Sequence, residues 1–313
     1  MKDKLVTLIG GGGFVGRYAA QALLRAGARV RVAQRDPRQA WYLKPLGGLG
    51  QTQFVAADVN RPDTVLRAVQ GADAVVNLVG VLAGDFQRAH VDGARTVAEA
   101  AAKAGCEALV HISAIGADRA SPSAYARSKG EGEEAVHAAF QNAAILRPSI
   151  VFGREDQFVN RFAQMVAKLP VVPVLRAHTR FQPVFAADVG DAIQAATVEP
   201  GRFGGRTFDL GGPDVITMGA LVRWIAETIG RRSSVVELPD FAGAALARAS
   251  FLPGAPITWD QWLMLQRDNI VGEGADGLAA LGVTPTPMAA VVPEYLVRYR
   301  RQGRFGRRSE QAF

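Results

Sequence analysis

Three residues have the types and the spacing to pass a proton to a carbonyl oxygen. Tyr125 and Lys129 form a YxxxK pair, and Ser113 stands twelve residues before the tyrosine. Residues four apart lie on one face of a helix, so the phenol and the ammonium can point at the same ligand. The ordinary pKa of a tyrosine is about 10. A lysine charge and an oxidised nicotinamide would lower it, so that the phenol exchanges a proton while a hydride moves and Ser113 holds the substrate oxygen.

A glycine pattern at the N-terminus suits a dinucleotide. The opening apolar run leads directly into glycines at positions 10, 13 and 16, and an amphipathic helical pattern follows. Gly10 permits a tight turn, Gly13 lets the backbone approach phosphates, and Gly16 lets the helix pack on the strand. Phe14 and Val15 then begin a helix whose free N–H groups and positive end favour a diphosphate. The alternative is a glycine turn with a purely structural role.

The end of the second predicted strand bears on which dinucleotide fits. An acid at this strand end bonds the ribose hydroxyls of NAD, whereas a nearby arginine accommodates the 2′-phosphate of NADP. Here Arg35 comes first and Asp36 follows one residue later. A guanidinium matches a phosphate in charge and geometry, so we expect NADP(H) to be favoured over NAD(H). Asp36 is the argument for the opposite preference.

The ends of the third and fourth predicted strands supply further candidates for the same ligand. Asp58, followed by Val59, either reaches the adenine amino group or caps a turn. The next strand end would pass the adenosine ribose or merely turn the chain; its residues are Asn77, Leu78, Val79 and Gly80. A place at the carboxyl end of a central strand favours contact with a ligand.

Short apolar runs alternate with helical patterns along much of the chain, which indicates βαβ units and a parallel sheet. Strands are expected at 4–9, 28–33, 53–57, 73–79, 107–113 and 143–147. Helices are expected at 15–26, 62–69, 88–104, 123–140, 156–168, 187–197 and 217–229, with shorter helical stretches near 258–269 and 289–301. The predicted fold class is α/β: a Rossmann-like, doubly wound parallel sheet with a smaller C-terminal lobe on the substrate side.

Two domains are expected. Residues 1–235 would form the NAD(P)-binding Rossmann domain, with substrate-side insertions after residue 150, and residues 236–313 a mainly helical lobe with a basic tail. The apolar stretch 241–252 would be a lid, an interface helix, a shallow membrane contact or simply a buried helix. Six arginines of the tail would touch an anionic partner or stay solvated at a disordered end: Arg298, Arg300, Arg301, Arg304, Arg307 and Arg308.

Composition excludes several classes of protein. The chain has 313 residues, of which 49% are hydrophobic and 21% charged, as is typical of a globular protein. No apolar run is long enough to span a bilayer, and the first strand begins so early that no signal peptide is expected. A single cysteine, Cys106, excludes an internal disulfide and suits a reducing compartment. We therefore expect a cytoplasmic protein.

The charged and metal-binding residue types also limit the partners. Four histidines without ligand spacing predict no metal site. The net charge is +7, but no nucleic-acid motif accompanies it, so we expect no nucleic-acid partner. The partner that the glycine turn predicts is a small-molecule dinucleotide.

Taken together, the glycine turn, the strand-end serine and the YxxxK pair resemble the short-chain dehydrogenase/reductase superfamily over residues 4 to about 230. The chain looks like an extended or atypical member, similar to NAD(P)-dependent epimerases and dehydratases. Segment 146–153 resembles the sixth strand and cofactor-facing turn of that group, which implies that Pro148 contacts the cofactor. Segments 181–189 and 208–213 resemble its later substrate-side strand and the strand before its last Rossmann-side helix.

Two further segments narrow the resemblance. Residues 44–51 and the string GREDQFVNRF at 153–162 are similar to the nucleotide-binding accessory subunit of respiratory complex I and its bacterial relatives. That family implies a Rossmann-like fold with bound, structural NADPH. It also implies complex I, or the inner face of the inner membrane near the quinone region, as a partner. One departure is at Gly11 and Gly12, where relatives often carry Ala-Thr or Gly-Ser, so a side-chain hydroxyl is lost from the turn.

The residues leave two functions open. In the first, the chain holds NADP(H) as a structural, assembly or redox-sensing module of the complex I accessory type. In the second, it is an oxidoreductase or epimerase in which Tyr125 is the acid or base, Lys129 lowers its pKa and binds the ribose, and Ser113 orients the carbonyl. The intact glycine turn disfavours a protein that binds no nucleotide. Within the 153–162 string, Arg154 and its acidic neighbours would form an ion pair or a helix cap, or Arg154 would contact a phosphate.

Overall fold

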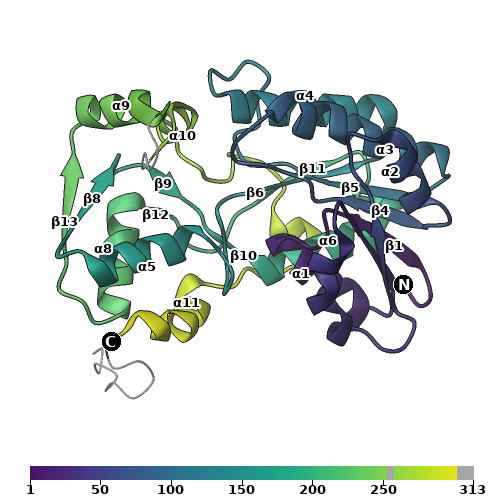
Figure 1. The fold of residues 1–313 in the computed structure, drawn as a ribbon, viewed down its shortest axis with the longest axis horizontal. Coiled ribbons are helices and arrows are strands. Elements are labelled where there is room, and N and C mark those ends of the chain that lie inside the picture. Colours follow the sequence, from purple (N-terminus) through teal and green to yellow (C-terminus); the bar gives the residue numbers. More distant parts are fainter. Residues whose placement is uncertain (252–256, 302–313) are drawn as a thin grey trace. The chain divides into compact units, whose positions relative to one another are not determined.

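The computed structural model describes residues 1–251 and 257–301, which form two compact units (Figure 1). Unit 1 combines residues 1–149, 186–211 and 271–285. Of the described residues, unit 2 combines 150–185, 212–251, 257–270 and 286–301. The chain therefore leaves unit 1 after residue 149 and returns to it twice. The domain boundary expected at residue 235 stays a prediction.

A seven-stranded sheet forms the centre of unit 1, in the order β11-β6-β5-β4-β1-β2-β3 (Figure 1). Its strands are β1 (Leu5–Ile9), β2 (Arg29–Gln34), β3 (Thr52–Ala56), β4 (Ala74–Asn77), β5 (Ala108–Ile112), β6 (Ala144–Pro148) and β11 (Thr207–Leu210). Every neighbouring pair runs parallel. The order reverses between β1 and β4, and such sheets bind ligands outside the carboxyl ends of the strands at that point. The predicted Rossmann-like, doubly wound fold is confirmed.

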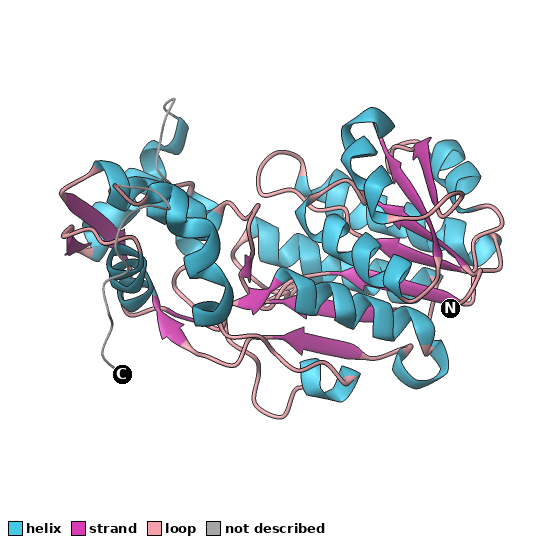
Figure 2. Ribbon diagram, turned by 90° about the horizontal axis from the view of Figure 1, so that it is seen from below, coloured by secondary structure: helices cyan, strands magenta, loops and turns pink. Residues whose placement is uncertain are grey.

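Helices cover both faces of this sheet (Figure 2). On one face, α1 (Phe14–Arg25) packs against α6 (Ala186–Val198). On the other face lie α2 (Pro62–Val69), α3 (Gly93–Lys103) and α4 (Ala124–Ala139). Strands β1 and β5 are buried along their whole length because both of their faces are covered.

Unit 2 consists of short paired strands and helices around its own apolar core (Figure 1). The pairs are β7 (Val151–Phe152) with β10 (Val184–Phe185), β9 (Arg180–Phe181) with β12 (Ile216–Thr217), and β8 (Val171–Leu175) with β13 (Ser234–Leu238). Its helices are α5 (Phe158–Lys168), α8 (Met218–Thr228), α9 (Asp240–Arg248), α10 (Trp259–Met264) and α11 (Met288–Leu296). Helices α5 and α8 pack on each other, and Val166, Leu221 and Ile225 are fully buried in the core.

The helices and strands predicted for unit 1 are confirmed, with ends that differ by at most two residues in all but one of them. The exception is the helix expected at 88–104, whose first part is the π-helical turn η2 (Gln87–Asp92) and whose remainder is α3. Three helical elements are not predicted: η1 (Pro37–Leu46), α7 (Pro200–Phe203) and η4 (Leu278–Leu281). The turn η5 (Val297–Tyr299) lies within the helical stretch expected near 289–301. Strand β8 is also unpredicted, because it contains Pro173. In a two-stranded pair the proline can occupy an edge, where its missing N–H costs no ladder bond.

The apolar stretch 241–252 forms a surface helix rather than a fully buried one. It contains α9 and the turn η3 (Ala249–Phe251), while Leu252 lies outside the described residues. Gly243 and Ala247 are buried, whereas Phe241 is 79% exposed. In the part of the chain that the structure describes, no helix has both the length and the apolar character needed to cross a bilayer.

The arginine tail is not wholly solvated. Arg298 donates to the Asn160 side-chain oxygen, and Arg300 Nε donates to the Thr228 carbonyl oxygen at 3.2 Å. These two arginines are thus held by unit 2. Three of the six lie outside the described residues: Arg304, Arg307 and Arg308.

Candidate functional site

The glycine turn between β1 and α1 has a tightly packed side and an open side. Gly10 has a φ of +78°, a left-handed conformation that favours glycine. A methyl group on Gly16 would lie 2.3 Å from the Gly11 carbonyl oxygen, so only glycine fits there. Gly13 is exposed, has a φ of −81°, and would place a methyl group no closer than 3.4 Å to a neighbouring atom. A phosphate group therefore has room at Gly13, next to the N–H groups of the first helical turn, which have no partner inside the helix.

The structure brings the ends of β1, β4 and β5 together beside this turn. Val79, just after β4, supports Gly10: its Cγ2 is 3.2 Å from the point where a Cβ on Gly10 would stand. The corresponding point on Gly80 lies 3.4 Å from Lys129 Nζ. Lys129 in turn donates to the Ile112 carbonyl oxygen at 3.2 Å, at the end of β5. Residues predicted from three separate patterns therefore share one edge of the sheet.

The other predicted residues lie along the same carboxyl edge. Pro148 ends β6, and its carbonyl oxygen accepts a hydrogen bond from the Ile115 N–H at 3.1 Å. Val59 follows β3 and packs against Gly93, whose Cβ position is 2.8 Å from Val59 Cγ2. Leu78 is half-buried directly after β4. Contact of these residues with a cofactor stays a prediction.

Lys129 is a buried ammonium on α4 that forms no ion pair within the described chain. Burial lowers the pKa of Lys129 to about 8, and the nearby Glu133 opposes that shift. Glu133 itself is paired with Arg147, whose Nε donates to it at 2.8 Å. A buried charge without an anion beside it is costly, so a ligand that brings hydroxyl or anionic groups to Lys129 is stabilised.

Tyr125 lies in the first turn of α4, between two other rings. The rings of Phe86 and His90 meet it edge-on, at centroid distances of 5.8 and 5.4 Å. His90 Nε2 accepts from the Val81 N–H at 2.9 Å, so the ring proton is on Nδ1 and is donated to Ser128 Oγ at 2.9 Å. Ser128 Oγ donates to the Tyr125 carbonyl oxygen at 2.8 Å. Ring packing and hydrogen bonds together fix the backbone and the ring that carry the phenol.

The two histidines of this edge are buried and neutral. Burial and the charge of Lys129 lower the pKa of both His90 and His111 to about 3. Asn77 Nδ2 donates to His111 Nδ1 at 3.1 Å, so the proton of that ring is on Nε2. His111 Nε2 and Ser113 Oγ are buried and have no hydrogen-bond partner within the described residues. Among those residues, no three His, Cys, Asp or Glu side chains are grouped to hold a metal ion.

Asp36 is held by its own neighbour. Its side chain caps η1 by accepting from the Arg38 N–H at 3.1 Å, and it also accepts from Arg38 Nε at 3.0 Å and Nη2 at 3.2 Å. These bonds lower the pKa of Asp36. Arg35, by contrast, is exposed and bonds to no other described residue. The acid that would favour NAD is thus engaged, and the base that would favour NADP is not.

Two of the predicted site residues have a structural role at their strand ends. Asp58 Oδ1 accepts from the backbone and side-chain N–H groups of Asn60, both at 3.0 Å, which is the turn alternative. Asn77 Oδ1 accepts from the Val79 N–H at 3.2 Å. Both side chains therefore shape the edge on which a ligand would rest.

The GREDQFVNRF string lies in unit 2, where Asp156 makes the cap expected at the start of α5. Its Oδ1 accepts from the Val159 N–H at 2.7 Å, and its Oδ2 accepts from the Tyr295 hydroxyl at 2.8 Å. Asn160 Nδ2 donates to the Asp156 carbonyl oxygen at 2.8 Å, and Arg298 donates to the same Asn160 side chain. The string thus ties α5 to helix α11 and to η5.

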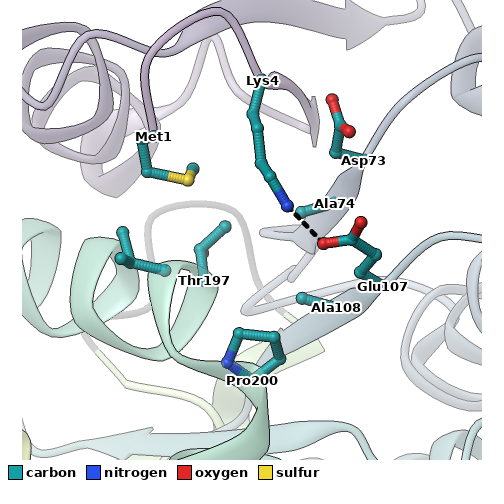
Figure 3. A pocket seen from close by; sticks show the side chains of 9 residues that line it. Met1, Lys4, Asp73, Ala74, Glu107, Ala108, Thr197 and Pro200 are labelled. Atoms are coloured by element: carbon teal, nitrogen blue, oxygen red, sulfur yellow. Dashed lines mark hydrogen bonds and ion pairs between the residues drawn. The ribbon is translucent and has the colours of Figure 1, made fainter.

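A small cavity of about 60 Å³ lies at the opposite, amino ends of β1, β4 and β5 (Figure 3). Lys4 and Glu107 form an ion pair at its rim, beside Asp73. Its volume is far below that of a ligand pocket, and ligands of such sheets bind at the carboxyl ends. The cavity is therefore separate from the candidate site.

The sequence patterns do not single out Arg38 or His90. A signal for the first exists: Asp36 precedes Pro37, and an acid followed by proline is typical of a helix N-cap. This pattern predicts that Asp36 caps a helix, so that Arg35 is the residue that can contact the ligand. His90 lies on the π-helical turn η2, which breaks the regular helical period.

Comparisons with known proteins agree with this geometry. The family model described as "NAD dependent epimerase/dehydratase family" matches residues 6–211, more than half of the chain. The chain therefore belongs to the NAD dependent epimerase/dehydratase family, as the resemblance in its sequence implies.

Within that family, the chain is homologous to a subunit of respiratory complex I. It is 35% identical over 305 residues to NADH dehydrogenase (ubiquinone) 1 alpha subcomplex subunit 9, mitochondrial, of Rattus norvegicus, covering 95% of this chain and 80% of the relative. The protein of the same name from Arabidopsis thaliana is 32% identical over 316 residues, covering 96% and 79%. Ceramide reductase of Caulobacter vibrioides is 31% identical over 261 residues, covering 80% of each.

Solved structures show the same fold. The NADPH-dependent quinone oxidoreductase of Escherichia coli, complexed with NADPH, superposes with a TM-score of 0.75 at 19% identity, covering 93% of this chain and 99% of that one. The dTDP-glucose 4,6-dehydratase of Streptomyces venezuelae, with NAD bound, has a TM-score of 0.73 at 19% identity, covering 96% and 98%. At these identities the likeness establishes the fold alone.

Proposed function

We propose that the protein binds NADP(H) at the carboxyl edge of the unit 1 sheet and holds it as a resident cofactor. The observation that carries this proposal is the contrast within the glycine turn: Gly10 and Gly16 are required by the fold, whereas Gly13 faces open space. If the turn had only a structural role, a larger side chain would fit at position 13. A diphosphate on the N–H groups of α1 uses that space.

The same residues fit the rest of a dinucleotide. Lys129 would bond the ribose hydroxyls next to the nicotinamide, because it is a buried donor without an anionic partner. At the other end Arg35 would bind the 2′-phosphate, since Asp36 is engaged by Arg38. The exposed Arg35 and the paired Asp36 support NADP(H) over NAD(H), because the two dinucleotides differ at the adenosine 2′ position.

The homology supports a place beside complex I. Relatives named as subunits of NADH dehydrogenase match nearly the whole chain. We infer that this chain associates with respiratory complex I on the inner face of the inner membrane, as an accessory subunit with a structural or redox-sensing cofactor. The test is cell fractionation at moderate salt. Co-fractionation with inner-membrane respiratory particles would support this association, and a fully soluble distribution would contradict it.

A second candidate function is that of an active reductase. The observation in its favour is the unpartnered Ser113 hydroxyl, which lies directly after β5 near Lys129. Bound NADPH would supply a hydride. Ser113 would hold the carbonyl oxygen, Tyr125 would donate the proton, and Lys129 would favour the phenolate that remains. The ceramide reductase relative suggests a lipid-like carbonyl substrate.

One experiment separates the two. The nucleotide released from the purified protein is identified by mass spectrometry, and the protein is then mixed with quinones and long-chain ketones while NADPH absorbance is followed. A resident cofactor predicts near-stoichiometric NADP(H) that resists oxidation. A reductase predicts oxidation that the Tyr125→Phe variant abolishes while cofactor affinity stays nearly unchanged.

A further inference from the structure

The helical turn η1 packs directly on the glycine turn. Its Ala40 and Leu43 are fully buried and anchor it to unit 1. Between them Tyr42 is 41% exposed, and its hydroxyl donates to the Gly12 carbonyl oxygen at 3.1 Å. The hydrogen bond thus joins a side chain of η1 to the backbone of the glycine turn, where we propose that the diphosphate binds.

Gly12 makes this contact possible. A methyl group on Gly12 would lie 2.0 Å from Gln34 Oε1 and 2.9 Å from Ala40 Cβ. The end of β2 and η1 thus occupy the space that a side chain at this position would need. Gly11 and Gly12 bring no hydroxyl of their own to the turn, and Tyr42 brings one from the adjoining segment.

The direction of the Gly12 carbonyl matters for an anion. A peptide group is planar and trans, so its carbonyl oxygen and the following N–H point to opposite sides. Tyr42 holds the carbonyl on the η1 side, and the Gly13 N–H donates to the Gly10 carbonyl oxygen at 3.1 Å. With both ends fixed, the negative end of this peptide dipole cannot turn toward the open side at Gly13.

Tyr42 also contacts a cation of the first helical turn. The Arg17 guanidinium carbon lies 4.4 Å from the centroid of the Tyr42 ring, within the range of a cation–π interaction. Arg17 directly follows Gly16. The ring therefore holds a positive charge close to the helix end that favours anions.

We propose that Tyr42 is a positioning residue of the diphosphate site: its hydroxyl fixes the Gly12 carbonyl away from the ligand, and its ring holds Arg17 beside the turn. This inference rests on the proposed function, because it concerns the same turn. It predicts that the hydroxyl contributes to the affinity for ligands with a diphosphate and not to the affinity for ligands without one.

The test compares two ligands on two variants. Tyr42→Phe removes the hydroxyl and keeps the ring on Arg17. We expect the Kd for NADPH, measured by calorimetry on nucleotide-free protein, to rise about 3- to 10-fold. The Kd for adenosine 2′-monophosphate, which has no diphosphate, should stay the same. Trp41→Phe, a neighbouring exposed aromatic on η1, is the matched control and should change neither value.

The possible results are distinguishable. An unchanged Kd for NADPH in Tyr42→Phe, with tight binding by the wild type, overturns this inference and leaves the proposed function standing. An equal rise for both ligands also overturns it, because it indicates a general loss of structure. A wild-type protein that binds no NADPH overturns the proposed function itself, and this inference with it.

Discussion

Arg38 holds both carboxylate oxygens of Asp36, with its Nε 3.0 Å from Oδ1 and its Nη2 3.2 Å from Oδ2. An acid at this strand end is the group that bonds the ribose hydroxyls of NAD and repels a 2′-phosphate. Asp36 directly follows Arg35 in the chain. Because Arg38 balances the negative charge of Asp36, that charge repels a 2′-phosphate bound at Arg35 less strongly. The preference for NADP(H) that we propose therefore depends on Arg38, which pairs with this acid.

Replacing Arg38 should shift the preference between the two dinucleotides. In Arg38→Ala the Asp36 carboxylate is released, so affinity for NADPH falls and affinity for NADH rises, changing their ratio about tenfold. Titration calorimetry with both cofactors measures the ratio. Gln39→Ala, at the exposed neighbouring position, is the control. A ratio that stays the same in Arg38→Ala would show that Asp36 plays no part in selection.

Lys129 should lower the free energy of unfolding while it raises the affinity for NADPH. Burial lowers its pKa from 10.5 to about 8, which means that the folded protein disfavours the charged form. Lys129→Met keeps the length of the side chain and removes the charge, so the free energy of unfolding at pH 7 should rise by about 1–3 kcal/mol. The affinity for NADPH should fall. Urea unfolding together with cofactor titration tests both effects, and a less stable variant contradicts the account.

Acid should destabilise unit 1 through its two neutral histidines. The pKa values of His90 and His111 are about 3, against an ordinary value of 6.5. Between these values the unfolded chain binds more protons, so the free energy of unfolding falls as the pH drops from 6.5 toward 3. Each histidine contributes a slope of up to about 1.4 kcal/mol per pH unit.

Urea unfolding between pH 7 and pH 5 measures this slope. His90→Gln removes one titrating ring, so the slope should decrease by the contribution of one histidine. The same slope in wild type and variant would mean that His90 is not held neutral in the folded protein.

The hydrogen bonds of Asp156 should stabilise unit 2 without affecting the binding of the cofactor. Its carboxylate is buried and accepts from backbone N–H groups as well as from Tyr295. Asp156→Ala leaves those donors unsatisfied and should cost about 3–5 kcal/mol. Tyr295→Phe removes one bond and should cost about 1 kcal/mol. Hydrogen exchange of α5 and α11 should rise in both variants while NADPH affinity stays constant; a loss of affinity equal to that of a glycine-turn variant would contradict this division of roles.

Local patterns predict most of the sheet of unit 1 because its central strands are nearly continuous apolar runs between turns. Strand β5, for example, is buried over all five residues, and such runs are typical of parallel sheets with both faces covered. The site residues at the strand ends follow from the same regularity, since parallel strands all end at one edge. The sequence therefore predicts that Ser113, Lys129 and the glycine turn lie along one edge of the sheet.

Residues that act through pairing are harder to predict. Tyr42 matters because η1 returns to the glycine turn, and that contact has no period or spacing that a single sequence reveals. The contact between Arg38 and Asp36 is local, and its one signal in the sequence is the proline that follows Asp36. Strand β8 contains Pro173, and it is a strand only because β13, more than fifty residues later, pairs with it. Such contacts depend on tertiary structure, which overrides local propensity.

The most direct test of the central claim is the Gly13→Val variant. Gly13 has a φ of −81° and open space at its Cβ position, so valine should leave the fold and its thermal stability nearly unchanged. The added side chain would stand where the diphosphate is expected, and the Kd for NADPH, measured by calorimetry, should rise about a hundredfold or more. A stable Gly13→Val protein that binds NADPH as tightly as the wild type would show that the dinucleotide does not rest on this turn.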